Sequence, residues 1–353
     1  MVNAGVAEYR RRTRIRVLAT VMIAAAAVII GAYSICISQY AVSFSEALDV
    51  IAKNLSGGTF DTYHDRLVNH IVWEGYLPIG IAGLLIGAIL ALGGAVMQTI
   101  VRNPVADAYT TGISSGALFG VTLFIVLDFQ IAGSSKDAGM ILTAFVFSMI
   151  PVAIIVLFAF FKKVISTVMV LIGIAVMYIF SSMSTLLRYT ASEEDIASIY
   201  SWTVGTLAGI GWNAIPWLLA AFVSAFAVLM VISPKINVLE SGDRMCTALG
   251  ENPFRIRIIC LVVTSIATSV AVCYSGTIGF VGLVCPHIAR AITGSNNRLL
   301  IPCSAAIGAL VLIAAETASR MVGSTGVSVG VITSLIGGPL FLYFLLRQRK
   351  SEW

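Results

Sequence analysis

Long apolar runs dominate this chain, and short segments between them contain nearly all of its charges. The 22 basic and 17 acidic residues leave nine charge-free stretches of 17 to 39 residues. A helix crosses a bilayer core of about 30 Å with about 20 apolar residues. A chain in lipid satisfies its backbone only as helices or as a closed barrel. The pattern therefore predicts an all-α polytopic membrane protein.

The charges at the two ends decide whether the number of spans is even or odd. Five arginines between residues 10 and 16 precede the first apolar run, and residues 347–350 place three basic side chains after the last one. Because basic flanks mark the cytoplasmic side, we expect both termini in the cytoplasm and an even number of spans. The first run, 17–37, resembles the apolar part of a signal peptide. It is long and lacks a convincing cleavage site, so we interpret it as a retained span.

An even number requires that one of the nine stretches holds two helices. Dividing 196–234 would place the basic segment 235–257 outside, against the positive-inside rule. The stretch 258–289 divides at Ser275-Gly276, where glycine can interrupt a helix. Ten spans follow, at about 17–37, 77–100, 111–128, 139–161, 164–187, 213–233, 258–275, 278–293, 299–320 and 327–346.

The distribution of charge supports this topology. It places 17 of the 22 basic residues in the cytoplasm and leaves five outside, namely Lys53, Arg66, Lys136, Arg188 and Arg320. The outer loops carry mainly acidic residues, namely Glu46, Asp49, Asp61, Asp65, Glu74, Asp128, Asp137, Glu193, Glu194 and Asp195. We therefore predict a multi-pass protein of the cell membrane with cytoplasmic ends.

Composition narrows the class further. A hydrophobic content of 58% and a mean hydropathy of +0.96 exclude a soluble protein. The net charge of +5 comes from basic residues beside the spans, so we expect membrane lipid and no nucleic acid as a partner. The chain is predicted to be one transmembrane domain, 1–353, with a basic tail at 1–16, a cytoplasmic segment at 234–257 and a tail at 347–353. Its six cysteines form no CxxC pair and are expected to act as small hydrophobic residues.

Two short helices are predicted outside the spans. Ser43 to Glu46 has the pattern of a capped helix start, which would run to about Asn54 on the outer surface. Residues 196–212 extend beyond what one span needs, and they contain Trp202 and Trp212. A short interfacial or re-entrant helix fits them, with the tryptophans at the level of the headgroups.

The second span carries a stripe of small residues at four-residue spacing, Gly83, Gly87, Ala91 and Ala95. Small residues on one face let two helix backbones approach closely in lipid. The stripe could pack within the subunit or against a second copy. Gln98 ends this span, and its amide suggests the interior of a bundle.

Residues 112–116, Gly-Ile-Ser-Ser-Gly, match the G-x-S-x-G pattern of hydrolases. The pattern follows no predicted strand, and His287 is the one histidine near a membrane interior. A glycine- and serine-rich helix start that packs closely is the better interpretation, and we expect no catalytic site.

The segment 237–257 is the longest cytoplasmic loop. Its charges alternate with Leu239, Met245 and Leu249, and Ser241 and Gly250 have the character of a helix cap and a stop signal. A short amphipathic helix here could dock a soluble partner, or the loop could have no function.

Metal binding is the weaker interpretation of two groups of residues. Cys285 and His287 are two positions apart and therefore point to different faces of a helix. An outer loop contains further possible ligands, namely Asp61, His64, Asp65 and His70. Solvated loop polarity explains them more simply, and we expect no metal.

Glu316 is the acidic residue inside a predicted span. Carboxylates within the membrane are costly and commonly functional, but Arg320 lies one helical turn later, in the favourable order for an ion pair. Both a structural pair and a proton site are open. The chain has no G-x-x-x-x-G-K-[ST] pattern, so ATP and Mg²⁺ would have to bind to another subunit.

Taken together, several strings resemble the permease subunits of iron-siderophore, haem and cobalamin ABC importers (the FecCD type, or type II importers). They are Gly93-Gly94-Ala95-Val96-Met97-Gln98, Arg102-Asn103-Pro104-Val105-Ala106-Asp107, Gly112-Ile113-Ser114-Ser115-Gly116-Ala117, Gly279-Phe280-Val281-Gly282-Leu283-Val284, Pro286-His287-Ile288-Ala289-Arg290 and Gly337-Gly338-Pro339. The resemblance covers about residues 15 to 348. It implies ten helices, a dimeric pore of two permease copies (a homodimer or a heterodimer), two cytoplasmic ATPase subunits and an extracytoplasmic substrate-binding protein.

The resemblance also implies roles for particular residues. The cytoplasmic segment would form the coupling helices that contact the ATPase, with Leu239, Glu240, Ser241, Gly242, Asp243, Arg244, Leu249 and Gly250 as the residues involved. Translocation or close packing would involve Gln98, Arg102, Asn103, Pro104, Gly112, Ser114, Ser115, Gly116, Pro286, His287, Gly337 and Pro339. Arg320 matches a rim arginine that receives a carboxylate of the binding protein.

The chain departs from the family pattern at the outer rim. The family usually has two arginines around Leu-Pro at the start of the second span, whereas residues 74–79 here contain neither. Glu316 replaces the usual Asp before Arg320, and Ser328 stands where the family often has Pro. The outer loops are also acidic, so a binding protein with acidic docking surfaces would be repelled. Either the binding protein carries different charges, or the transporter uses no binding protein.

These observations lead to an ATP-driven importer permease as the main hypothesis. Ferric siderophore is the most common substrate that the resemblance suggests, with haem, cobalamin and oxyanions as alternatives. The second hypothesis is an ion-driven secondary transporter that uses Glu316 as a proton site, and such a protein would need no ATPase.

Overall fold

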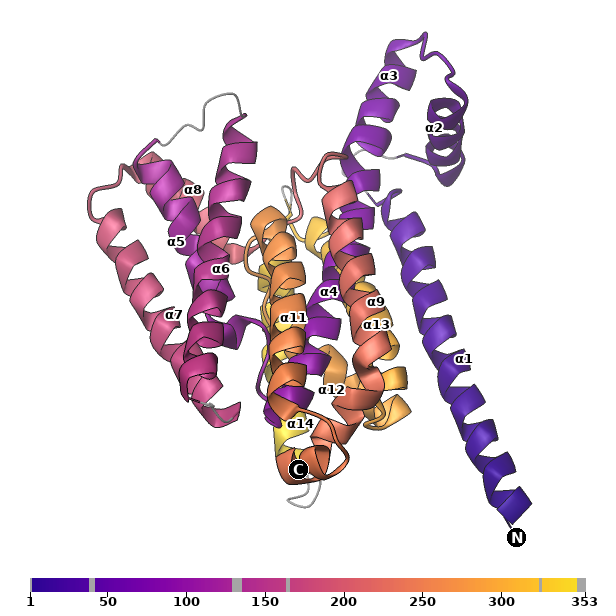
Figure 1. The fold of residues 1–353 in the computed structure, drawn as a ribbon. Helices are drawn as coiled ribbons and strands as arrows, with labels where there is room; N and C mark the ends of the chain where they lie inside the picture. The colour runs from indigo at the N-terminus through magenta and orange to yellow at the C-terminus, as the bar shows by residue number, and fades with distance from the viewer. Residues whose placement is uncertain (1, 38–41, 129–134, 163–165, 324–325, 348–353) are drawn as a thin grey trace.

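The computed structural model describes residues 2–37, 42–128, 135–162, 166–323 and 326–347, and within these ranges the regular structure is entirely helical (Figure 1). The longer helices are α1 (Val2–Ser34), α4 (Leu77–Val101), α6 (Lys136–Lys162), α7 (Ser166–Arg188), α9 (Ile215–Glu240), α11 (Pro253–Ser275), α13 (Asn297–Arg320) and α14 (Val329–Arg347). The shorter elements are α2 (Phe44–Ser56), α3 (Tyr63–Asn69), the π-helix η1 (His70–Tyr76), the 3₁₀ turn η2 (Tyr109–Thr111), α5 (Ile113–Val126), α8 (Glu193–Val204), α10 (Asp243–Ala248) and α12 (Val281–Thr293).

Every predicted span coincides with an apolar helix. Among the described residues, seven helices are long and apolar enough to cross a bilayer, and three shorter apolar helices occupy the remaining predicted positions, at 113–126, 281–293 and 329–344. The membrane-protein class is confirmed, whereas the number of ten crossings stays a prediction.

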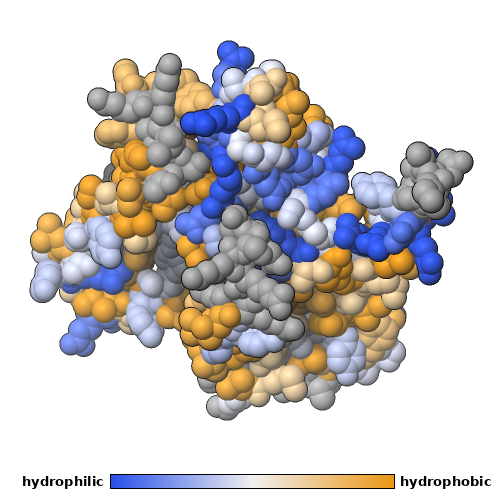
Figure 2. Space-filling model, turned by 90° about the horizontal axis from the view of Figure 1, so that it is seen from below, coloured by the Kyte–Doolittle hydropathy of each residue, from blue (hydrophilic) through white to orange (hydrophobic). Residues whose placement is uncertain are grey.

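The two ends of the bundle differ in charge. The start of α1, the segment with α10 and the end of α14 lie at one end (Figure 1), which we call the basic end. Its arginines and lysines include Arg102, Lys235, Arg244, Arg255, Arg257, Arg290 and Arg298. Elements α2, α3 and α8 lie at the opposite end, which we call the acidic end (Figure 1). In Figure 2, hydrophilic side chains gather across the face seen from below, beside apolar surfaces.

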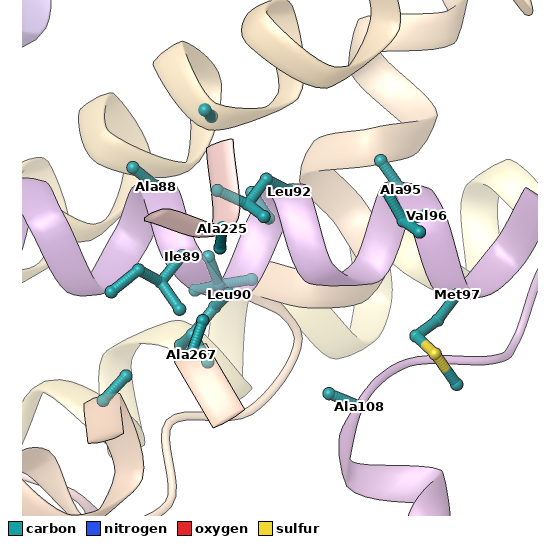
Figure 3. Close-up of a cluster of buried hydrophobic side chains, with 14 of the residues drawn as sticks. Ala88, Ile89, Leu90, Leu92, Ala95, Val96, Met97, Ala108, Ala225 and Ala267 are labelled. Carbon is teal, nitrogen blue, oxygen red and sulfur yellow. The ribbon is translucent and has the colours of Figure 1, made fainter. Parts of the chain in front are cut away.

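Helix α4 lies at the centre of the bundle. It packs against α9, α11, α12 and α13, and every residue from 86 to 101 is buried. Figure 3 shows its side chains between Ala225 of α9 and Ala267 of α11. Only a strongly apolar helix with small residues can be surrounded in this way.

Glycines permit the closest of these contacts. A Cβ atom at Gly87 would overlap the carbonyl group of Gly308 on α13, and one at Gly94 would overlap that of Gly282 on α12. Ala91 in turn lies against Gly308. The stripe of small residues therefore packs within the subunit, which decides between the two alternatives that its spacing allows.

The stretch 258–289 is divided as the sequence predicts. Helix α11 ends at Ser275, Gly276 has a φ of 67°, and α12 begins only at Val281. The carbonyl of Ser275 accepts a hydrogen bond from the backbone N–H of Thr206 at 2.8 Å. The segment after α8 therefore supplies a hydrogen-bond donor to a carbonyl at the C-terminal end of α11. Backbone groups within lipid need such partners.

The two predicted short helices are present. Ser43 and Glu46 form a reciprocal capping box at the start of α2, which ends at Ser56. Helix α8 covers only the first part of the predicted 196–212 region, because it ends at Val204. It begins earlier than predicted, where Ser192 and Asp195 form a second capping box. Residues 205–214 form a loop with turns. Helix α1 runs continuously from residue 2 through the predicted basic tail and into the first span.

The contact between α4 and α12 leads to a stability prediction. Gly94→Ala places a methyl group against the Gly282 carbonyl. We expect this overpacking to lower the free energy of unfolding by about 3 kcal/mol. Gly80→Ala in the same helix is the control. Its methyl group would lie 3.8 Å from Gly31 O and Ser34 Oγ, an ordinary contact. Thermal unfolding in detergent should show a lower midpoint for Gly94→Ala alone, and equal midpoints would contradict this account.

Candidate functional site

A short helix, α10, is presented at the basic end between α9 and α11. The sequence suggested Ser241 as its N-cap, but Ser241 is the C-cap of α9. The N-cap of α10 is Gly242, which has a φ of 112°. Gly250 does act as the stop signal. It has a φ of 82°, and the N–H groups of Gly250 and Glu251 bond to the carbonyls of Thr247 and Cys246, which is the Schellman arrangement.

Helix α10 has one face in the protein and one in solvent. Cys246 and the preceding Leu239 are fully buried, whereas Met245 and Leu249 are 53% and 61% exposed. Arg244 is exposed on the same short helix. An apolar pair beside a positive charge, held at the end of a bundle, is suited to contact another protein.

Asp243, the first residue of α10, binds two arginines from different parts of the chain. Arg257 of α11 donates from both terminal nitrogens to the two carboxylate oxygens, at 2.6 and 2.8 Å. Arg102, just after α4, forms an ion pair with the same carboxylate. Hydrogen bonds from Arg257 hold the pKa of Asp243 below its ordinary value. We call Asp243, Arg102 and Arg257 the arginine–aspartate node.

Arg102 begins a tightly folded loop at the end of α4. Its φ of 54° is left-handed, and the N–H groups of Arg102 and Asn103 bond back to the carbonyls of Thr99 and Gln98. The Asn103 side chain accepts a hydrogen bond from the N–H of Val105 at 3.0 Å, across Pro104. The predicted Arg102-Asn103-Pro104 motif is therefore a helix stop followed by a turn.

Asp107 lies in the same loop and is buried. Its carboxylate accepts a hydrogen bond from the N–H of Thr110 at 2.9 Å, and its side chain lies against Gly282 at the start of α12. Burial raises the pKa of Asp107 to about 6.

A second polar cluster joins α4, α9 and α12. Gln98 is fully buried and accepts a hydrogen bond from Arg290 at 2.5 Å. Glu240, the last residue of α9, interacts with Arg290 and accepts a hydrogen bond from Ser295, while partial burial raises its pKa. Gln98 thus lies in the interior, as predicted, and Glu240 is partly buried beside Arg290. The role of Glu240 in contact with an ATPase stays a prediction.

Two asparagines join α9 to the start of α13. The Asn237 side chain accepts hydrogen bonds from both the backbone and the side chain of Asn297, at 2.8 and 2.9 Å. Asn297 is fully buried. Sequence reasoning missed these two residues and Arg257. Their signal was weak, since each is a polar residue next to the predicted end of a span, where a solvated position is equally common.

The Gly112-to-Gly116 motif is a packing element. Gly112 has a φ of 89° and is the N-cap of α5. A Cβ atom at Gly116 would lie 2.5 Å from the Phe147 carbonyl. Ser115 Oγ donates a hydrogen bond to Gly112 O at 2.9 Å. Ser114, beside it, is partly buried. These contacts bring α5 and α6 together.

His287 and the α14 motif meet at one interface. The His287 ring lies against Phe341 and Phe344 of α14, and its Nδ1 is 2.7 Å from Leu283 O. Gly337 of α14 makes room for Phe280, whose φ is 66°. Pro286 lies buried within α12, while Pro339 is exposed on α14.

Glu316 and Arg320 form an ion pair at the acidic end. The Nε–Oε1 distance is 3.1 Å, and the two side chains are 8% and 12% exposed. Arg320 also donates to the Ser34 carbonyl at 3.2 Å and lies over the Tyr76 ring. Both charged residues line a cleft of about 680 Å³.

The possible metal ligands at the acidic end do not converge. His64 pairs with Glu46, and His70 pairs with Glu74. Among the described residues, no group of three or more His, Cys, Asp or Glu side chains could hold a metal ion.

A bundle of apolar helices that are long enough to cross a bilayer defines an integral membrane protein. The chain belongs to the FecCD transport family, whose model matches residues 10–347. It is thus a membrane permease subunit of the ABC importer class and not itself an enzyme.

Relatives agree with this membership. The chain is 31% identical to the iron(3+)-hydroxamate import system permease protein FhuB of Bacillus subtilis, over 86% of this chain and 79% of the relative. It is 36% identical to the cobalamin import system permease protein BtuC of Halobacterium salinarum, over 78% and 72%. A solved metal-chelate type ABC transporter in an inward-facing conformation superposes with a TM-score of 0.81 at 27% identity, covering 93% of this chain and 99% of that one.

Burial of Asp107 leads to a prediction about pH. Because its folded pKa of about 6 exceeds the ordinary 3.8, folding binds a proton more tightly, and this residue's contribution to stability falls as pH rises from about 4 to about 6. Asp107→Asn removes this decrease in stability with rising pH, because the asparagine side chain does not titrate. We expect the stability of the variant relative to the parent to rise by about 2 kcal/mol between pH 4 and 7. Thermal unfolding of both proteins across this range measures it, and a constant difference would refute the assignment.

Proposed function

We propose that this chain is the permease subunit of an ATP-driven importer of a metal chelate, with ten spans, the type II importer fold and both termini in the cytoplasm. The observation that carries the proposal is α10, whose exposed Met245 and Leu249 lie at the basic end of a FecCD-family bundle. The positive-inside rule assigns that end to the cytoplasm, where an ATPase can reach it.

The pore would form between two copies of the chain. Two ATPase subunits, which bind ATP and Mg²⁺, would contact the two α10 helices, and an extracytoplasmic binding protein would deliver the substrate. ATP binding can shift the permease between outward- and inward-open states only if the ATPase interacts differently with the two. The α10 helix would transmit that difference.

The binding protein would dock over the acidic end. Arg320 lines the cleft there and is the proposed contact, but it already binds Glu316. An incoming carboxylate would therefore compete with Glu316 for the guanidinium group.

A chelate of iron fits the family best, and the named relatives carry ferric hydroxamate and cobalamin. We propose a ferric siderophore as the substrate, with haem and cobalamin as the alternatives. A ligand screen of the binding protein would distinguish them.

The ATPase contact can be tested by co-purification. Replacing Met245 and Leu249 with Glu buries charge in the proposed apolar contact, and we expect at least about a tenfold loss of bound ATPase. Leu55→Glu on α2 makes the same change at the acidic end, where Leu55 is 77% exposed, and it should leave the complex intact. Equal recovery of ATPase with all the variants would exclude α10 as the docking element.

Glu316 distinguishes the ion-driven alternative. In our proposal, the Glu316 carboxylate, which lies 3.1 Å from Arg320, has a structural role. Glu316→Gln should then lower stability, because Arg320 loses its charged partner. The variant should keep the ATP dependence of uptake. Uptake into proteoliposomes is measured with ATP or with a pH gradient as the energy source. Uptake driven by the pH gradient without ATP, and abolished by Glu316→Gln, would establish the ion-driven mechanism instead.

A further inference from the structure

The arginine–aspartate node joins three elements that are distant in sequence. Asp243 begins α10, Arg257 belongs to the first turns of α11, and Arg102 follows the last turn of α4. One carboxylate thus holds both arginines. A helix of six residues has few contacts of its own, so these bonds add to the burial of Cys246 in determining its position.

Burial makes the bond between Asp243 and Arg257 hard to break. The Arg257 side chain is 5% exposed, and a buried charge that loses its partner is strongly unfavourable. Its Nε also donates to Ile100 O at 3.0 Å. Displacement of α10 must therefore take Arg257 with it, or else leave a guanidinium group buried and unpaired.

The end of α4 is held by the same node. The last carbonyls of a helix lack partners within it, and here those of residues 98, 99 and 100 accept from Asn103 N, Arg102 N and Arg257 Nε. Two of these three donors belong to the arginines of the node. The α4 terminus and the loop that follows it are consequently fixed to α10.

We propose that Asp243 is a positioning residue that makes α10, the end of α4 and the start of α11 move as one unit, so that movement of α10 is delivered to the 102–112 loop. The inference rests on the proposed function for the source of the movement. The physical connection itself is a property of the isolated chain.

Hydrogen exchange of the purified permease tests the connection without any partner. Asp243→Asn removes the charge but keeps the shape, and we expect faster amide exchange at residues 100–107. Arg102→Gln, at a side chain that is 41% exposed, removes only the branch to α4 and should have the same local effect even if Asp243→Asn folds poorly. Glu8→Gln is the control, because it removes a carboxylate from an exposed ion pair with Arg12 on α1.

Transport by the reconstituted complex tests the consequence. We expect Asp243→Asn and Arg102→Gln to lower substrate uptake per ATP hydrolysed by about tenfold, a common size for coupling between sites, and Glu8→Gln to leave this ratio unchanged. An unchanged ratio in both node variants, or unchanged exchange at 100–107, would overturn the proposal. If instead the parent protein transports without ATP, the proposed function fails, while the exchange result still decides whether the node connects the helices.

Discussion

Close contact between helix backbones around α4 is the constraint on which this structure depends. Lipid offers little hydrophobic gain for association between helices, so packing must supply it. Gly87 and Gly94 let α4 reach the backbones of α13 and α12 without an intervening side chain. The same contacts place the C-terminal end of α4 beside α10, α11 and α12 at the basic end. They therefore determine which polar residues can meet there.

At that end, burial and charge act together. Arg257 and Gln98 are almost completely removed from solvent, and each is satisfied by a partner from another helix: Asp243 for Arg257, and Arg290 for Gln98. Buried polar groups without partners are costly, so these networks specify one arrangement of the helices. The exposed side chains of α10 face away from them, which separates the surface for a partner from the contacts that position the helix.

The acidic end differs from the basic end in the exposure of its charged residues. Its carboxylates lie mostly on exposed helices and turns, such as the capping boxes of α2 and α8, and its buried ion pair lies one turn inside α13. Arg320 contacts Glu316, Ser34 and Tyr76, and its Nη2 is buried without a hydrogen-bond partner among the described residues. This end therefore presents acidic surface around a cleft.

The sequence alone determined the class of the protein, the positions of its apolar helices, the break at Ser275-Gly276 and the short helices that begin after Ser43 and near residue 196, because hydrophobic periodicity, charge and capping are local signals. It also indicated that α10 would lie in the 237–257 loop, but placed its start at Ser241. Only the tertiary structure decided that the glycine stripe packs within the subunit, that Glu240 interacts with Arg290 and that Asp243 binds both Arg102 and Arg257. Arg102 and Asp243 are 141 positions apart in the sequence, and the residues joined by the glycine contacts are still farther apart. No local pattern specifies which distant partner a side chain meets.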